Sequence, residues 1–247
     1  MDIDNKVSFP DLLGLSETDP EFVALFKQFA FQEVPKDLPF SLDERRYYLA
    51  TLAVLVGSQG LEAYKEILPV DLDNGVKAVE VKELLYQAVA YLGLSRVYAF
   101  FAPTNTIFTN QGTSLPLASQ KNTKNQTRLE AGEEAQIAIF GDQMKGFATK
   151  GEPDVRHINK WLVDNCFGDY YTRSSLDYAE RELLTFCYLY SQGGCEPQLK
   201  GHIAANLRLG NDKNLLIAVI SACIPYIGYP RTINALSCIN EVANAQQ

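Results

Sequence analysis

Two stretches of this 247-residue chain resemble each other, and this internal repeat is the feature that most constrains the fold. The sequence ERRYYLATLAVLVGSQGLEAYKEI (44–67) aligns with ERELLTFCYLYSQGGCEPQLKGHI (180–203) at an offset of 136 residues. Farther along, YLGLSR (91–96) aligns with YIGYPR (226–231) at an offset of 135 residues. Because self-similarity of this kind marks a repeated structural unit, we expect two copies of one unit within the chain.

The side chains that could carry chemistry are confined to the second copy. The alignment pairs them as follows: Cys195 with Gln59, His202 with Glu66, and Glu182 with Arg46. The first copy therefore keeps the apolar pattern but lacks the thiol, the imidazole and the carboxylate. We predict that the first repeat is a scaffold and that the second repeat carries any active site.

Cys195 and His202 are predicted to lie near the start of one helix. Glu196-Pro197 marks the helix N-terminus, because proline is well suited to the first helical turn. A helix N-terminus favours a thiolate, and seven residues turn by about 700°, so both side chains project to one side. They would nevertheless lie on the order of 10 Å apart along the axis, whereas direct hydrogen bonding needs about 3 Å. The spacing does not imply a Cys–His dyad.

Apolar residues recur at helical spacing through most of the chain, and strand signals are few, so we predict an all-α fold. Capping residues, prolines and glycines give the helix limits. In the first repeat, Ser41 or Asp43 caps the first helix, and Pro69 ends the second one. The expected helices cover residues 19–31, 43–56, 61–68, 79–92, from 95 onward, 130–147 and 155–167. Residues 102–127 are predicted to be an extended connector, and 165–177 an aromatic-rich loop.

We expect four regions along the chain. They are an N-terminal helical extension (1–40), a first repeat with a degenerate site (41–101), a connector with helices (102–175), and a second repeat with the candidate site (176–247).

The charge and composition exclude some classes of function. The 22 Lys and Arg against 30 Asp and Glu give a net charge of −8, which argues against nucleic-acid binding, because that needs clustered basic residues. No apolar run is long enough to span a bilayer, and the acidic first residues lack the apolar core of a signal peptide. The five cysteines form no spaced pairs. We therefore expect a cytoplasmic protein with reduced thiols.

The second repeat resembles the carboxymuconolactone decarboxylase family, which includes the alkyl hydroperoxidase D-like proteins. The resemblance rests on ERELLTFCYLYSQGGCEPQLKGHIAANLRLGN (180–211) and IPYIGYPRTINAL (224–236), and it extends more weakly over 44–101. It implies an all-α unit that assembles into rings of six. A chain with two units would then form a homotrimer that makes a pseudo-hexameric ring.

The resemblance also implies candidate site residues, with two departures from the family pattern. His202, Cys195 and Glu182 would be catalytic. Peroxidase-type members have Cys-x-x-Cys, but Gln198 stands at the second cysteine position, and Glu182 is one residue farther from the cysteine than usual. The predicted substrate-binding residues are Lys200, Tyr226 and Arg231.

Three functions remain open at this point. The first is a lyase in which His202, aided by Glu182, moves a proton on a small carboxylate or lactone, while Lys200 or Arg231 steers the carboxylate. The second is a thiol peroxidase that uses Cys195. The third is a non-enzymatic oligomeric binding protein. No metal-ligand cluster or phosphate-binding glycine loop occurs in the sequence, so we expect no cofactor and no metal.

Overall fold

The computed structural model describes residues 14–245 and is all-α, with helices and no strand in that range, as predicted. The N-terminal helices are α1 (Pro20–Gln28), the π-helix η3 (Phe29–Glu33) and α2 (Val34–Asp37). The first repeat contains α3 (Glu44–Gly57), α4 (Leu61–Asp73), α5 (Ala78–Leu92) and α6 (Leu94–Asn110). The middle region contains α7 (Arg128–Phe140), the 3-10 helices η4 (Asp142–Met144) and η5 (Phe147–Thr149), α8 (Arg156–Trp161) and the π-helix η6 (Leu162–Tyr171). The second repeat contains α9 (Tyr178–Gln192), α10 (Glu196–Arg208), α11 (Lys213–Ala222), α12 (Ile224–Ile227) and α13 (Tyr229–Ala245).

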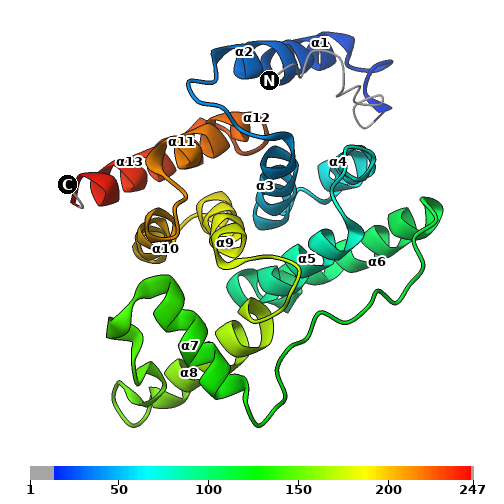
Figure 1. Cartoon of the computed structure of the whole chain (residues 1–247). Helices are drawn as coiled ribbons and strands as arrows, with labels where there is room; N and C mark the ends of the chain where they lie inside the picture. Colours follow the sequence, from blue (N-terminus) through cyan, green and yellow to red (C-terminus); the bar gives the residue numbers. More distant parts are fainter. Residues whose placement is uncertain (1–13, 246–247) are drawn as a thin grey trace.

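Helices α3 and α9, which begin the two repeats, pack together at the centre of the molecule (Figure 1). Their N-termini are capped in the same way, because Asp43 accepts a hydrogen bond from the Arg46 amide and Asp177 accepts one from the Glu180 amide. The two helices approach closely at Gly57, where an added Cβ would lie 1.9 Å from the Ser191 hydroxyl oxygen. A side chain at position 57 would therefore displace the Ser191 hydroxyl and crowd the main-chain oxygen of Tyr188.

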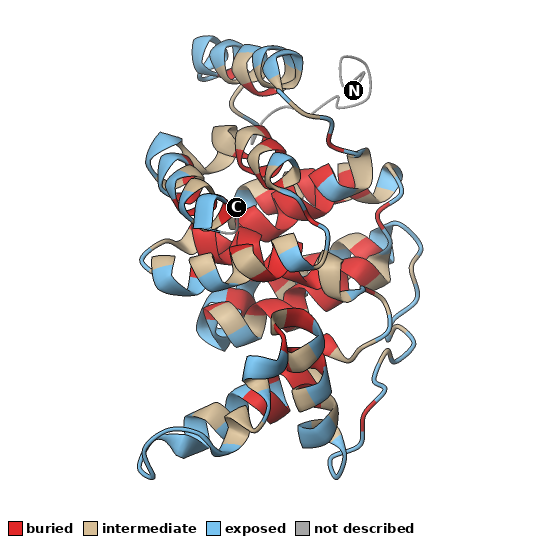
Figure 2. Cartoon of the chain, turned by 60° about the vertical axis from the view of Figure 1, so that its left-hand side comes forward, coloured by how far each residue is buried: buried red, intermediate tan, exposed pale blue. Residues whose placement is uncertain are grey.

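The remaining helices surround this central pair. Helices α1 and α2 lie at one end of the molecule, and α7 and α8 lie at the opposite end (Figure 1). Buried residues concentrate in the middle, whereas the outer faces of both ends are largely exposed (Figure 2). The main apolar core includes residues of both repeats, such as Leu52 and Leu84 from the first and Phe186 and Ile239 from the second. The two repeats therefore share one core.

Two predicted helix ends in the first repeat are wrong. Pro69 does not end its helix, because α4 runs through it to Asp73. Helix α6 likewise continues through Pro103 to Asn110, although residues from 102 onward were expected to be extended. A proline inside a helix removes one backbone hydrogen bond, and burial of neighbouring apolar residues such as Leu68 and Phe108 outweighs that loss.

Two predictions for the middle region are also wrong. The helix expected over 130–147 ends at Phe140, where Gly141 has a φ of +101° that breaks the helix. The loop expected from residue 165 is helical as far as Tyr171, because α8 continues directly into the π-helix η6. Burial of Val163, Cys166 and Phe167 holds this segment in place.

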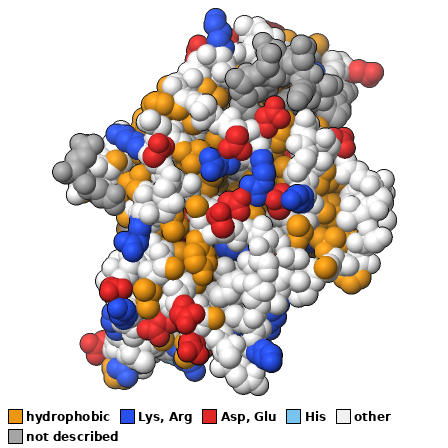
Figure 3. Space-filling view, viewed as in Figure 1, with side chains coloured by type: hydrophobic (Ala, Val, Ile, Leu, Met, Phe, Trp, Pro, Cys, Tyr) orange, Lys and Arg blue, Asp and Glu red, His pale blue; other side chains and the backbone are white. Residues whose placement is uncertain are grey.

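The described part of the chain contains no helix that is both long and apolar enough to cross a bilayer. On the face seen in Figure 3, lysine and arginine side chains alternate with acidic ones, and they do not form a continuous basic surface. One such group joins the repeats, since Arg45 of α3 pairs with both Glu80 of α5 and Glu180 of α9.

Candidate active site

The structure brings His202 of α10 and Glu182 of α9 into direct contact. The imidazole Nδ1 lies 2.7 Å from the Glu182 Oε2, which is within hydrogen-bond distance. Glu182 is fully buried, whereas 13% of the His202 side chain is exposed. Asn206 fixes the register of the two helices, because its amide nitrogen donates to the main-chain oxygens of both Glu182 and His202. A buried carboxylate thus orients a largely buried imidazole.

The second oxygen of Glu182 is also satisfied. Tyr171, the last residue of η6, donates its hydroxyl proton to the Glu182 Oε1 at 2.8 Å. Burial raises the pKa of Tyr171 well above its ordinary value, so the phenol stays protonated and acts as a donor. The Tyr171 oxygen also lies 2.6 Å from the Tyr91 hydroxyl and 2.7 Å from the Thr185 hydroxyl. Since Tyr171 has one hydroxyl proton, both of these neighbours must donate to it.

Gln87 of α5 fixes the far end of this network. Its amide nitrogen donates to the Arg181 main-chain oxygen at 2.8 Å and to the Thr185 hydroxyl at 2.9 Å. Its amide oxygen accepts from the Arg181 guanidinium at 3.0 Å. Flipping the amide would break all three contacts, so its orientation is fixed. The donors therefore run in one direction, from Gln87 through Thr185 and Tyr171 to Glu182.

The direction of these hydrogen bonds determines which nitrogen of His202 carries the proton. With Glu182 accepting at both oxygens, the imidazole Nδ1 must donate, and so Nδ1 carries a hydrogen. Nε2 makes no hydrogen bond with any residue of the described range. It is the imidazole atom left available to a substrate, with a lone pair in the neutral form and a proton in the cationic form.

Two aromatic rings flank the imidazole. Tyr91 of α5 lies edge-on to it with ring centroids 5.4 Å apart, and Phe140 of α7 lies edge-on at 5.5 Å. These two edge-on contacts restrict the orientation of the imidazole ring and give it aromatic neighbours.

Glycines let η6 approach close enough to place Tyr171. A Cβ at Gly132 of α7 would lie 2.0 Å from the main-chain oxygen of Val163, and a Cβ at Gly168 of η6 would lie 2.2 Å from that of Arg128. The two helices therefore pack backbone to backbone, which only glycine permits at these positions. The wide turns of a π-helix are frequent at functional sites.

Cys195 lies at the N-cap of α10, as predicted, but it makes no contact with His202 within the described structure. Its thiol donates to the Leu189 main-chain oxygen at 3.3 Å and lies 3.6 Å from the Gln192 amide nitrogen. Burial raises the pKa of the Cys195 thiol above its ordinary value, which opposes the predicted effect of the helix N-terminus. The resting state is a protonated thiol.

The three predicted substrate-binding residues lie apart from His202. Lys200 pairs with Glu241 of α13 at 2.6 Å, and it is two residues from His202, on another face of α10. Arg231 lies against Gly193 and lines a small recess together with Cys195. Tyr226 packs against Phe26 with ring centroids 6.3 Å apart, on the side of α1. The structure records no contact between any of them and the imidazole, and their role in binding stays a prediction.

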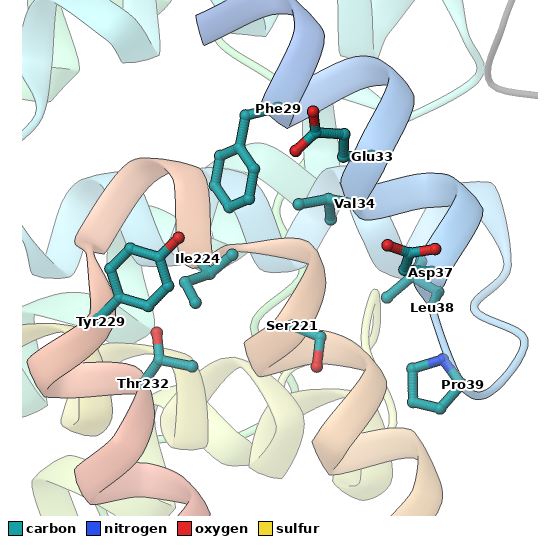
Figure 4. A pocket seen from close by; sticks show the side chains of 10 residues that line it. All are labelled: Phe29, Glu33, Val34, Asp37, Leu38, Pro39, Ser221, Ile224, Tyr229 and Thr232. Carbon is teal, nitrogen blue, oxygen red and sulfur yellow. The ribbon is translucent and has the colours of Figure 1, made fainter. Parts of the chain in front are cut away.

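A cavity of about 260 Å³ opens between the N-terminal helices and α11–α13, and none of the predicted site residues lines it (Figure 4). The Glu33 and Asp37 carboxylates lie on one wall, and the Tyr229 and Thr232 hydroxyls lie on the other. In the described range, no group of three or more His, Cys, Asp and Glu side chains is arranged to hold a metal ion.

Sequence reasoning missed the residues that complete the site. The predicted loop over 165–177 includes Tyr171, and the sequence does not single out Gln87, Tyr91 or Phe140 as site residues. The repeat pairs Tyr91 with Tyr226. The repeat itself gives no sign that the first copy would contribute side chains to the second copy's site.

Within an all-α fold, the second repeat thus places an imidazole against a buried carboxylate and between two aromatic rings. Residues 157–241 match the model of the carboxymuconolactone decarboxylase family. The matched part of the chain includes Glu182, Cys195 and His202. No curated protein matches the sequence.

The chain is also similar to a solved structure. That structure is a 1.70 Å crystal structure of a protein from Burkholderia xenovorans, described as a gamma-carboxymuconolactone decarboxylase subunit. The two share 18% sequence identity with a TM-score of 0.57, and the match covers 96% of this chain and 92% of the other. The similarity extends over both repeats and establishes the carboxymuconolactone decarboxylase-type fold for nearly the whole chain.

Proposed function

We propose that this protein is a lyase that decarboxylates a small lactone carboxylate, with His202 as the group that moves the proton. The observation that carries the proposal is the contact between His202 and the buried Glu182. A carboxylate that fixes the tautomer and orientation of a histidine is a recurrent arrangement in acid–base catalysis. The family match of residues 157–241 and the description of the solved relative as a decarboxylase subunit suggest the substrate class.

The reaction requires one proton to be delivered. Loss of CO2 breaks a carbon–carbon bond and leaves its electron pair on the substrate, where the lactone carbonyl can delocalise it. A proton must then be added to carbon, and the imidazolium supplies it from Nε2. The neutral imidazole regains a proton from water, so the net change is RCO2⁻ + H⁺ → RH + CO2. Glu182 stabilises the imidazolium while it is charged.

The surroundings of the imidazole suit this task. The Tyr91 and Phe140 rings flank the imidazole, and a carboxylate loses CO2 more readily when it is removed from water. The proposal assigns Cys195 no proton transfer, because its thiol is protonated and does not contact His202. A peroxidase would need that thiol as a thiolate.

The test is CO2 release from gamma-carboxymuconolactone by the purified protein and by histidine variants. We expect His202→Gln to lower kcat by about 10²- to 10⁴-fold, the usual contribution of general acid–base catalysis. The chain offers a matched control, because its second histidine, His157, is exposed and its ring lies against Trp161. His157→Gln should leave the rate unchanged.

Cys195→Ser separates this proposal from the thiol alternative. If the serine variant keeps its decarboxylase rate while His202→Gln loses it, the acid–base proposal is supported. Peroxide consumption that disappears in Cys195→Ser, together with no CO2 release, would show a thiol peroxidase instead. A protein in which neither substitution changes any activity would be a binding protein that retains the fold.

A further inference from the structure

A pocket of about 310 Å³ lies in the first half of the molecule, between α1, α4 and α12. It is separate from the His202 site, because none of the residues around that imidazole lines it. Its volume is at the lower end of the range for small-molecule sites. It is therefore large enough for a compact organic molecule.

Aromatic rings form much of its wall. Phe22 and Phe26 come from α1, and Tyr226 comes from α12. The Phe26 and Tyr226 rings meet edge-to-face with centroids 6.3 Å apart, and the Phe22 and Phe26 centroids are also 6.3 Å apart. Leu55 and Ile67 add aliphatic surface. The faces of aromatic rings carry partial negative charge and attract cations.

Among the described residues that line the pocket, Glu66 is the one acidic or basic side chain. It makes no hydrogen bond or ion pair with any part of the chain that the structure describes, whereas its neighbour Glu62 is paired with Lys65. A carboxylate on an apolar wall is favoured when a positive charge accompanies it. The pocket thus combines aromatic rings with an unpaired negative charge.

The repeat relates this pocket to the His202 site. Glu66 aligns with His202, and Tyr226 aligns with Tyr91. A phenylalanine from helices that precede each repeat's aligned residue lies nearby, since Phe26 packs against Tyr226 and Phe140 packs against His202. The pocket therefore occupies the place in the first half that the imidazole occupies in the second half.

We propose that this pocket binds a small organic ammonium ion with an apolar body, and that Glu66 pairs with the ammonium group. The aromatic rings would receive the apolar body and add cation–π attraction. An anionic ligand is disfavoured, because the pocket would bring it next to an unpaired carboxylate.

The probe is phenethylammonium, compared at pH 7 with 2-phenylethanol and phenylacetate, which have similar apolar bodies and different charge. Binding is measured by titration of the full-length protein with ligand-observed NMR. We expect phenethylammonium to bind about tenfold more tightly than 2-phenylethanol, because a hydrogen bond to a charged group adds about this much. Phenylacetate should bind more weakly than either.

Two variants locate the site. Glu66→Gln should reduce binding of the ammonium to the level of the alcohol and leave binding of the alcohol unchanged. His202→Gln should leave ammonium binding unchanged, which distinguishes this pocket from the catalytic site and makes the result independent of the proposed reaction. The variants are first checked for a native melting transition.

Equal binding of the ammonium and the alcohol to the unsubstituted protein would overturn the proposal, and this comparison needs no variant to fold. The proposal would also be overturned if Glu66→Gln left saturable ammonium binding unchanged, or if none of the three probes bound saturably.

Discussion

Replacing Glu182 with glutamine is expected to move the proton on the His202 ring from Nδ1 to Nε2. In the native site Glu182 accepts from Tyr171 at one oxygen and from Nδ1 at the other. The glutamine oxygen can keep the bond from Tyr171, and its NH2 group then faces Nδ1. Because two donors cannot share a hydrogen bond, Nδ1 must become the acceptor and Nε2 must take the proton.

The contact between Glu182 and His202 gives the size of the preference for the Nδ1–H tautomer in the native protein. A hydrogen bond between Nδ1–H and a buried carboxylate contributes about 1.5–3 kcal/mol. This corresponds to about a 10- to 150-fold preference for the Nδ1–H form. The native neutral imidazole should therefore be almost entirely in one tautomer, and Glu182→Gln should reverse it. The same reversal removes the Nε2 lone pair, so the neutral ring could no longer accept a proton there.

The measurement is ¹⁵N NMR of the imidazole nitrogens, and it needs no substrate. The chain has two histidines, so the spectrum contains two ring systems, and His157→Gln assigns them. Tyr91→Phe is the matched control, because it removes a hydroxyl from the same network and leaves the contact between Glu182 and His202 intact. An unsubstituted protein with Nε2–H on His202, or a glutamine variant with an unchanged spectrum, would refute the assigned donor order.

Other consequences of the structure can be tested without knowing the substrate. Gly132→Ala should destabilise the protein by about 1–3 kcal/mol or more in urea unfolding, because the added Cβ meets a main-chain oxygen at 2.0 Å; an unchanged midpoint would contradict this packing. Burial raises the pKa of Asp71 well above its ordinary 3.8, and its carboxyl oxygens have no partner within the described chain. The stabilisation that comes from this raised pKa is fully present below pH 3.8 and is lost as pH rises through the folded-state pKa. The quantity to measure is the unfolding free energy of the native protein minus that of Asp71→Asn. We expect this difference to fall above about pH 4 by up to about 1.4 kcal/mol per pH unit. A difference that stays constant with pH would contradict the burial of this carboxyl. Of the five cysteines, Cys195 alone is not buried, so iodoacetamide should label only Cys195 in the native protein. Labelling should be slower than that of a small free thiol, because the pKa of Cys195 is raised. Fast labelling, or labelling of Cys187, would contradict this expectation.

The fold class and the central pair of the site could be predicted from the sequence because both depend on local patterns. Helical periodicity and caps such as Asp43 and Asp177 are properties of short segments, and the structure confirms the all-α fold. Glu182 and His202 stood out because the first repeat has other residues at the aligned positions. Helix limits at Pro69 and around Pro103 were wrong, because tertiary burial decided them and local propensity did not.

The rest of the network depends on contacts between distant segments. Gln87 lies 98 residues from Thr185, and Tyr91 lies 80 residues from Tyr171. No spacing rule relates such pairs in a single sequence. Gly132 and Gly168 could have suggested a close helix crossing, but without knowledge that α7 meets η6 they are indistinguishable from ordinary helix glycines.

The first repeat is therefore more than the scaffold that the sequence predicts, because it supplies Gln87 and Tyr91 to the site. The hydroxyl hydrogen of Tyr171 is committed to Glu182, and the hydroxyl hydrogen of Thr185 is committed to Tyr171. Burial also keeps the phenols protonated by raising their pKa. His202 is then the member of this network that can gain or lose a proton at an atom without a partner, Nε2. A substitution of Gln87 in α5 should therefore change proton transfer at His202, although the two side chains are not in contact. In this way the first repeat supports the site without contributing a reactive group of its own.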